Sequence, residues 1–351
     1  MDSPETPAPG AADSRRDPAK LAEAAQQTNW HVYRMTPTRT GDMPVALNPE
    51  AAASHVQNVI DWRINQLPPE VPLPEYIHDK LPGIYNFVAK VAGVDVDSLP
   101  ELSAADDHDR HGLHIPMLGH AYIAPHATEG LPEHVEKFYQ AMTESTAVHE
   151  IAHGVANADP GLTHNTVIMT PQTGGTSYDY VMTEAGGLGK THFYTKEGTP
   201  QTGQTLSFLR EGWAETLAMR YMAEQELNGE LAPNYPFVYT TAEGEQLPIG
   251  PKYVVMCEGM WGVTQTSLAA YAMDMLDECL ATINPSSRQL FDIMRDMQHV
   301  ETQIQAQQEL AATLNSLQPG LYKELTTLAY TESDMVKGYK IAQELKTLMV
   351  P

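Results

Sequence analysis

Two histidines four residues apart, His149 and His153, constrain this chain of 351 residues more than any other feature of its sequence. They lie in a segment with helical apolar spacing, and side chains at i and i+4 of a helix project from one face, about 6 Å apart along the axis. Both imidazoles can then reach one zinc ion at about 2.0–2.1 Å. The spacing therefore predicts a helix that supplies two zinc ligands, in preference to a helix with two ordinary polar histidines.

Glu150, directly after the first histidine, supplies a carboxylate at the same place. On a helix it is offset toward the coordination position that a water molecule occupies, and there it can act as a general base for that water. Gly154 follows the second histidine, where a side chain would crowd a nearby wall. The HExxH pattern alone is short, so its interpretation depends on finding further ligands.

A third protein ligand is required because catalytic zinc sites hold the ion with three side chains and leave one position open. The best candidate is Glu211 in the segment Phe208–Thr216, FLREGWAET. Glu215 stands one helical turn later, and we expect it to accept the free ring N–H of His149. The neighbouring residues are apolar, so this helix face is predicted to be buried, and a buried carboxylate needs a partner. Asp159 and Asp179 remain alternative third ligands.

The pair of segments resembles the gluzincin group of zinc peptidases, which includes thermolysin-like enzymes and zinc aminopeptidases. The resemblance covers the HExxH helix and the REGWAE segment, and not the flanking regions. It implies an active-site helix packed under a small sheet, with substrate held along an edge strand, for which residues 121–124 are the candidate. His153 and Glu211 are farther apart than in those families, and no GAMEN motif is present, so the family below the group level stays open. Peptide deformylase is disfavoured because no cysteine precedes His149.

A hydrolase of this kind also needs a donor for the oxyanion that forms on the attacked carbonyl. In gluzincins a tyrosine or histidine usually has this role. Tyr180 and Tyr194 are preferred because the predicted hairpins between the two metal-binding helices are expected near the cleft. Tyr178, Tyr253 and Tyr271 remain open.

The order of elements predicts an α+β fold, with a zincin-like helix under a small mixed sheet and a largely helical C-terminal lobe. We expect a disordered tail at 1–27, a catalytic lobe at 28–228 and a helical lobe at 229–351. Residues 21–67 carry mixed helical signals, and 106–114 are interpreted as a polar loop in which His108, His111 and His114 are solvated rather than metal-bound. Predicted helices are 77–97, 133–158, 205–227, 263–283, 286–315, 319–329 and 333–349, and predicted strands are 120–127, 166–170, 177–183 and 191–195.

Composition narrows the class of partner. The formal net charge is −24, which disfavours nucleic acid and anionic membrane as partners and suits a peptide substrate or a divalent metal ion. Cys257 and Cys279 are the only cysteines, without metal-type spacing, so a disulfide framework is not expected. The sequence shows neither a secretory leader nor an apolar run long enough to cross a bilayer, and we expect a cytoplasmic protein.

These observations together predict a zinc-dependent peptidase acting on a peptide or protein substrate. His149, His153 and Glu211 would hold Zn²⁺, and Glu150 would activate the water. Two alternatives use the same residues. One is a catalytically silent zincin-fold protein that serves as a binding module or scaffold, and the other is a hydrolase of non-peptide amides.

Overall fold

The computed structural model describes most of the chain after residue 66 and a few shorter segments elsewhere. The described residues are 31–38, 41–46, 48, 50–51, 54, 67–107, 110–115, 120–128, 130–157, 165–169, 179–182, 193–194, 200–201, 206–225, 237–257, 260–299 and 301–350. The predicted tail at 1–27 and Asp159 lie outside them. The described part mixes helices with small sheets, which agrees with the expected α+β class.

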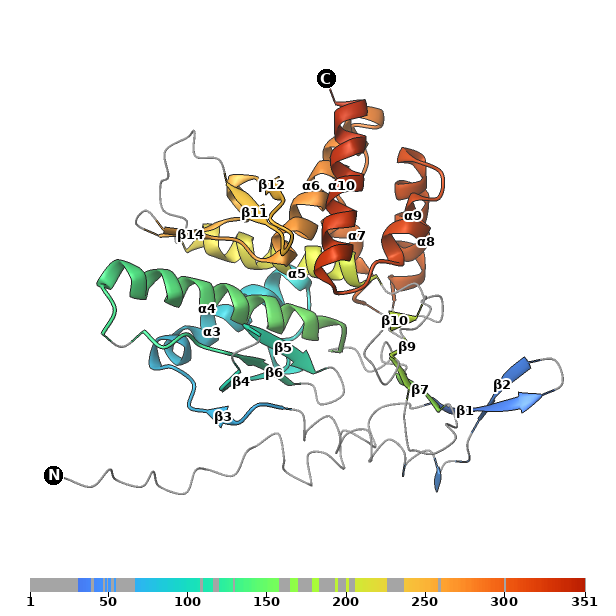
Figure 1. The fold of residues 1–351 in the computed structure, drawn as a ribbon, viewed down its shortest axis with the longest axis horizontal. Helices are drawn as coiled ribbons and strands as arrows, with labels where there is room; N and C mark the ends of the chain where they lie inside the picture. The colour runs from blue at the N-terminus through green and yellow to red at the C-terminus, as the bar shows by residue number, and fades with distance from the viewer. Residues whose placement is uncertain are drawn as a thin grey trace.

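A four-stranded sheet lies against one long helix (Figure 1). The strands are β3 (Glu70–Val71), β4 (Glu101–Ala105), β5 (Gly112–Ile115) and β6 (His120–Ile123), in the order β3-β4-β6-β5. β4 and β6 are parallel, and the other two pairs are antiparallel. Ala121 and Ile123 of β6 are completely buried in the core shared with the helix, and Tyr122 is buried in a second cluster with Leu67 and Ala105. In the strand order β6 is an interior strand and β5 forms an edge.

That helix, α4 (Glu133–His153), carries the HExxH residues in its last two turns. Pro132 precedes it, and the carboxylates of Glu133 and Glu136 in the first turn interact favourably with the positive end of the helix dipole. The helix ends at Gly154, where an added Cβ would lie 2.3 Å from the ring of Pro100. The crowding expected at Gly154 is therefore confirmed. A short 3-10 helix, η4 (Gly154–Asn157), follows.

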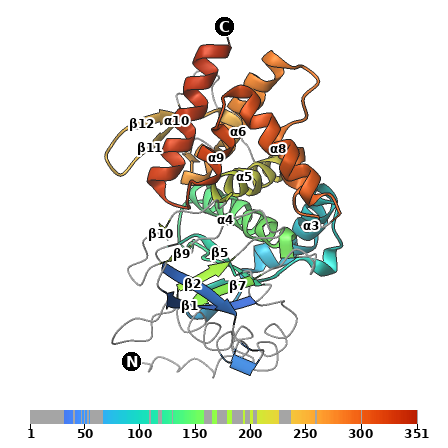
Figure 2. The same cartoon turned by 90° about the vertical axis from the view of Figure 1, so that its right-hand side faces the viewer.

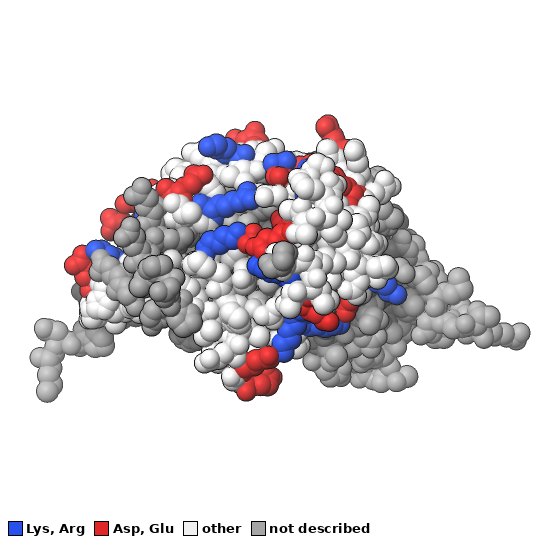
Figure 3. All heavy atoms as spheres, turned by 90° about the horizontal axis from the view of Figure 1, so that it is seen from above, with Lys and Arg blue, Asp and Glu red and all other residues white. Residues whose placement is uncertain are grey.

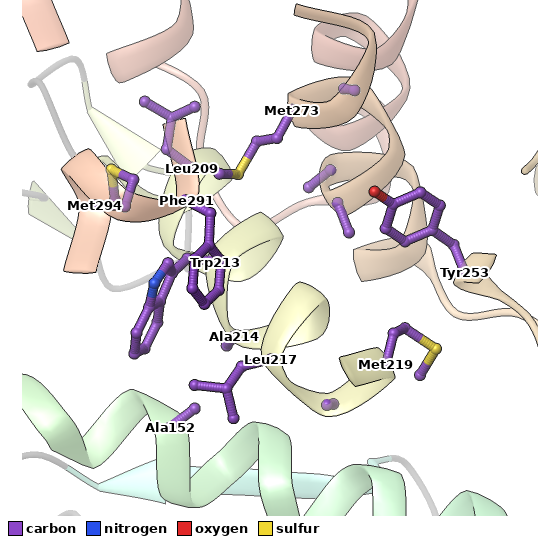
Figure 4. Packing of buried hydrophobic residues seen from close by; sticks show 14 of the residues in the cluster. Ala152, Leu209, Trp213, Ala214, Leu217, Met219, Tyr253, Met273, Phe291 and Met294 are labelled. Carbon is purple, nitrogen blue, oxygen red and sulfur yellow. The ribbon is translucent and has the colours of Figure 1, made fainter. Parts of the chain in front are cut away.

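Helix α5 (Ser207–Glu224) packs on α4 from the side opposite the sheet (Figure 2). Trp213 and Leu217 of α5 are buried, and Figure 4 shows Leu217 above Ala152 of α4. On its other side α5 approaches α6 so closely that a Cβ on Gly212 would lie 2.9 Å from the backbone oxygen of Ala269. The glycine next to Glu211 thus sets how closely α5 lies to α6.

The rest of the described chain completes the core. Helix α3 (Glu75–Ala92) and the 3-10 helix η2 (Val96–Ser98) flank α4, and the C-terminal helices are α6 (Gln265–Ile283), α7 (Leu290–Asp296), α8 (Gln303–Leu317), α9 (Leu321–Thr326) and α10 (Glu332–Met349). Two hairpins follow α5 in the chain and precede α6. The first pairs β11 (Val238–Thr240) with β12 (Gln246–Pro248), the second pairs β13 (Val255–Cys257) with β14 (Met260–Gly262), and the 3-10 helix η5 (Pro251–Tyr253) connects them. One buried apolar cluster includes side chains from α3 to α10, on both sides of the expected boundary at residue 228.

A second four-stranded sheet joins an N-terminal hairpin to the segment between α4 and α5. Its strands are β1 (His31–Thr38), β2 (Gly41–Ala46), β7 (Asn165–Met169) and β8 (Asp179–Met182), in the order β2-β1-β7-β8. β1 pairs in parallel with β7, and β9 (Phe193–Tyr194) pairs with β10 (Pro200–Gln201). The helical signals predicted across 21–67 are therefore wrong for 31–38 and 41–46, which form strands and include β-branched and aromatic residues.

Two further predictions need correction. Residues 106–114 are not wholly a loop, because 112–115 form β5. The single helix predicted at 286–315 is two helices, α7 and α8, joined by a turn. In that turn the ring N–H of His299 donates to the backbone oxygen of Ala92 at 2.8 Å, and Thr302 Oγ1 donates to the backbone oxygen of Asp296 at 2.6 Å. These hydrogen bonds to α3 and α7 stabilise the turn that separates the two helices.

Among the described residues no helix is both long and apolar enough to cross a membrane. Charges of both signs lie beside one another on the face in Figure 3. Several form ion pairs across neighbouring elements, including Lys252 with Asp274, Lys340 with Glu245 and Lys346 with Glu278. Exposed pairs of this kind contribute little to stability.

Candidate metal centre

The last two turns of α4 and the first turns of α5 bring His149, His153 and Glu211 together. The two Nε2 atoms are 3.0 Å apart, and Glu211 Oε2 lies 3.1 Å from His149 Nε2 and 3.2 Å from His153 Nε2. One ligand atom from each residue lies within 4.8 Å of the others, and all three side chains are largely buried. The structure thus collects the three ligands that the sequence predicted.

The shape of this group suits a divalent metal ion. Three atoms bound to one tetrahedral zinc at about 2.0–2.1 Å lie about 3.3 Å from one another. The triangle of ligand atoms, with edges of 3.0, 3.1 and 3.2 Å, is close to one face of such a tetrahedron. Two imidazoles and a carboxylate bind zinc and several other transition metals. The three residues could therefore hold a metal ion.

Glu215 orients the first of these ligands from one turn along α5. Its Oε2 lies 3.0 Å from His149 Nδ1 and accepts a hydrogen bond from Thr266 Oγ1 at 3.0 Å, and its Oε1 accepts one from Ser267 Oγ at 3.1 Å. Because the Nδ1–H of His149 donates to Glu215, the lone pair of Nε2 faces the metal position. The hydroxyl groups at the start of α6 in turn fix the carboxylate, which is itself buried.

Replacing Glu215 with glutamine should weaken zinc binding by roughly 10–100-fold, because the amide polarises the His149 ring less than the carboxylate does. Competition with a chromogenic chelator measures this change. Glu224, exposed at the end of the same helix, provides the control variant Glu224→Gln, whose zinc affinity should equal that of the wild type. Equal affinities for both variants would rule out the orienting role of Glu215.

The electrostatics of the ligands depend on their burial and on one another. Burial disfavours charge on His149, but hydrogen bonds with Glu211 and Glu215 outweigh it and hold its pKa well above the ordinary value. Burial lowers the pKa of His153. Burial alone would raise the pKa of Glu211, but the charge and hydrogen bonds of the two histidines hold it well below its usual range. Glu211 is therefore an anionic ligand.

Glu150 is buried on the same helix, between α4 and the edge strand. Burial raises the pKa of its carboxyl to about 7, with Glu211 and Glu215 adding to the effect, while the charge of His149 and a hydrogen bond from the backbone N–H of His114 oppose it. The backbone of Gly112 lies directly against this side chain, and a Cβ there would be 2.7 Å from Glu150 Cγ. A carboxyl with a pKa near neutrality can both accept and release a proton.

His114 is a core residue of the site and not the solvated loop residue that its polar surroundings suggested. It is 8% exposed on β5, and its ring stacks on that of His153 with centroids 6.4 Å apart. Burial lowers its pKa, and the charges of His153 and Arg210 lower it further. The substrate-strand candidate at 121–124 is also wrong, because residues 120–123 form the interior strand β6 and the edge strand is β5.

The structure describes the side chains of only some of the tyrosines that were expected to stabilise the oxyanion. Tyr180 lies in β8 and Tyr194 in β9, but their side chains are outside the described part, as is all of Tyr178. Tyr253 and Tyr271 pack against each other with ring centroids 5.6 Å apart, and Tyr253 is buried in the core. The strand position of Asp179, one alternative metal ligand, is described, and its side chain is not.

Sequence reasoning missed Tyr330, which lies between α9 and α10. Desolvation and the charge of Glu211 raise the pKa of its hydroxyl, a hydrogen bond with Gln265 lowers it, and the charges of Glu150 and Glu215 raise it further, so the hydroxyl is within electrostatic range of the site. The residue is nonetheless 53% exposed, so a substrate can reach it. Its turn is fixed by a hydrogen bond from the backbone N–H of Ala329 to Asp334 at 3.0 Å. No local pattern in the sequence links position 330 to the HExxH segment.

Comparison with known protein families, curated proteins and solved structures finds no match. The assignment of function therefore depends on the residues of the site itself.

Proposed function

We propose that this protein is a zinc-dependent hydrolase of peptide bonds, of the gluzincin type. The observation that carries the proposal is the convergence of His149, His153 and Glu211 on one point, beside a buried glutamate from the same helix. The contact between Glu215 and His149 supports it, because metal-binding histidines generally donate their second ring N–H to an oxygen acceptor. These residues supply a ligand set, a base and an orienting partner.

The residues divide the chemistry among them. His149, His153 and Glu211 would hold the zinc ion, which would supply polarisation of a carbonyl group and a lowered pKa for a bound water molecule. Glu150 takes the proton from the attacking water and passes it to the leaving amine, a transfer suited to a carboxyl with a pKa of about 7. Its burial keeps bulk water away from the proton, and the hydrogen bond from the backbone N–H of His114 fixes its orientation.

An extended peptide fits the open edge of β5. In the antiparallel pair of β5 and β6, the backbone N–H of Ala124 donates to the backbone oxygen of His111 at 2.7 Å, and Leu113 stands opposite Tyr122. Hydrogen-bonded positions alternate, so the backbone groups of Gly112 and His114 face away from β6. The backbone N–H of His114 donates to Glu150, so a peptide would pair here with the backbone of Gly112. Within the described residues no strand pairs with this edge. A peptide added there as a strand would pass next to Glu150, which favours a peptide over another amide as substrate.

Tyr330 would donate its hydroxyl hydrogen to the oxyanion that develops on the attacked carbonyl. Replacing it with phenylalanine should lower kcat by roughly 10²–10³-fold, the effect of losing one such donor, while zinc content stays unchanged. Peptide-cleavage kinetics and metal analysis measure the two quantities. Tyr322→Phe, which removes a hydroxyl that contacts Gln307 on α8, is the matched control and should keep the wild-type kcat. A Tyr330→Phe enzyme with wild-type kcat would exclude this role.

Metal analysis followed by a peptide-library cleavage screen tests the proposed function directly. We expect about one zinc per chain, cleavage that stops when a chelator removes the metal, and recovery when zinc is added back. Zinc binding without cleavage of any peptide would instead support the scaffold alternative. Turnover of simple amides without peptide cleavage would support the non-peptide alternative. A purified protein that binds no divalent metal would refute the proposal.

A further inference from the structure

A second pair of histidines meets at the beginning of the edge strand, away from the catalytic ligands. His111 directly precedes β5, and His126 lies in the segment between β6 and α4. Their ring centroids are 5.3 Å apart, and the ring planes cross at 52°. We propose that His111 and His126 form a second, weaker transition-metal site, here called the rim site. The proposal is independent of the peptidase activity.

The candidate metal ligands His149 and His153 provide a reference geometry for two imidazoles that could share one ion. The rings of His149 and His153, whose nitrogens converge on the metal position, have centroids 4.7 Å apart and cross at 77°. A zinc ion at about 2.0–2.1 Å from each ring nitrogen in tetrahedral geometry requires a centroid separation of about 5 Å. The rim pair meets this separation at 5.3 Å, and its rings cross at 52°.

A third pair shows that two neighbouring histidines do not always have the ring geometry needed to share one ion. His114 and His153 have centroids 6.4 Å apart and nearly parallel rings, with an interplanar angle of 19°. Rings stacked in this way direct their nitrogens past each other rather than toward one point. Of these three histidine pairs, only the catalytic pair and the rim pair have rings that are both close and strongly crossed.

The surroundings of the rim pair fix its rings and suit a metal. The backbone hydrogen bond from Ala124 to His111 holds the two chain segments together at 2.7 Å. The ring of His126 also packs against that of Tyr139 of α4, with centroids 4.6 Å apart. Burial lowers the pKa of His126, and the neighbouring charge of His111 lowers it further, so that its ring is neutral as metal binding requires.

An ion at the rim site would also hold the edge strand β5 in place. Tyr139 precedes His149 by ten residues on α4, which corresponds to about 15 Å along the helix axis. An ion at the rim site would tie the beginning of β5 to the segment after β6 without touching the catalytic ligands. Because β5 carries Gly112 and His114, such an ion would hold the strand against which Glu150 packs. Metal in excess of one equivalent would therefore bind at the open end of this edge.

Calorimetric titration of the full-length protein with Zn²⁺ tests the rim site. We expect two classes of site, the second on the order of a hundredfold weaker because it has fewer protein ligands. The variant His126→Ala should keep the tight site and lose the second class. His134, exposed on α4 and outside the pair, provides the control His134→Ala, which should retain both classes.

A second variant, His111→Ala, guards against misfolding, because His111 is exposed and its loss leaves the core unchanged. It should also lose the weaker class. Retention of the second class in both His111→Ala and His126→Ala would overturn the proposal, as would a wild-type protein that binds only one equivalent of zinc. None of these outcomes depends on turnover, so a protein without peptidase activity can still show the rim site.

Discussion

Replacing Glu150 with glutamine should lower kcat by roughly 10²–10⁴-fold, the usual contribution of a general base, and leave bound zinc in place. Glutamine has the same shape and fills the same buried space, but it cannot accept the proton of the attacking water. The metal stays because its three ligands, His149, His153 and Glu211, are unchanged. Initial rates on a peptide that the wild type cleaves, together with zinc content, measure the two predicted effects.

Glu133→Gln is the matched control for this variant. It changes a carboxylate on the same helix that is 81% exposed and pairs with Lys137. We expect its rate and zinc content to equal those of the wild type. An active Glu150→Gln enzyme would contradict the role of Glu150 as the base, and loss of zinc from it would show that the residue acts on metal binding instead.

The metal-binding half of the site was predictable because its signals are local. His149 and His153 are four residues apart on α4, and Glu211 and Glu215 are four residues apart on α5, so helical periodicity alone places each pair on one face. Burial of the second pair followed from the apolar residues around it. What the sequence could not supply was the packing of α5 on α4, which brings Glu211 to the two histidines.

The remaining features depend on contacts between distant segments. β5 has four residues and begins in a run of charged and polar residues, so neither its alternation nor its composition predicts a strand. It forms because β6 and α4 cover it. Tyr330 comes to the site only because α10 begins beside α5, where Gly338 leaves space for Phe208. The strands of β11 to β14 are too short for a periodic signal, with three residues each.

Replacing Gly112 with alanine should also lower kcat strongly, although glycine carries no reactive group. A Cβ at this position would lie 2.7 Å from Glu150 Cγ, 2.8 Å from Thr146 Cγ2 and 2.9 Å from Glu150 Oε1. In Gly112→Ala the Glu150 side chain must therefore move. A displacement of about 1 Å of a catalytic group can lower the rate by roughly a hundredfold, so we expect kcat to fall by about that factor while the zinc content stays at the wild-type level.

Gly83→Ala is the control because it makes the same substitution in α3 where an added Cβ meets no atom within 4 Å. Activity should be unchanged there, and thermal stability should rise slightly, since alanine is favoured over glycine in a helix by about 0.5–1 kcal/mol. Gly112→Ala should melt earlier than the wild type, because overpacking of this kind costs about 1–3 kcal/mol. If its kcat matched that of the wild type, the carboxylate of Glu150 would tolerate displacement, and a role for Glu150 as a positioned base would be untenable.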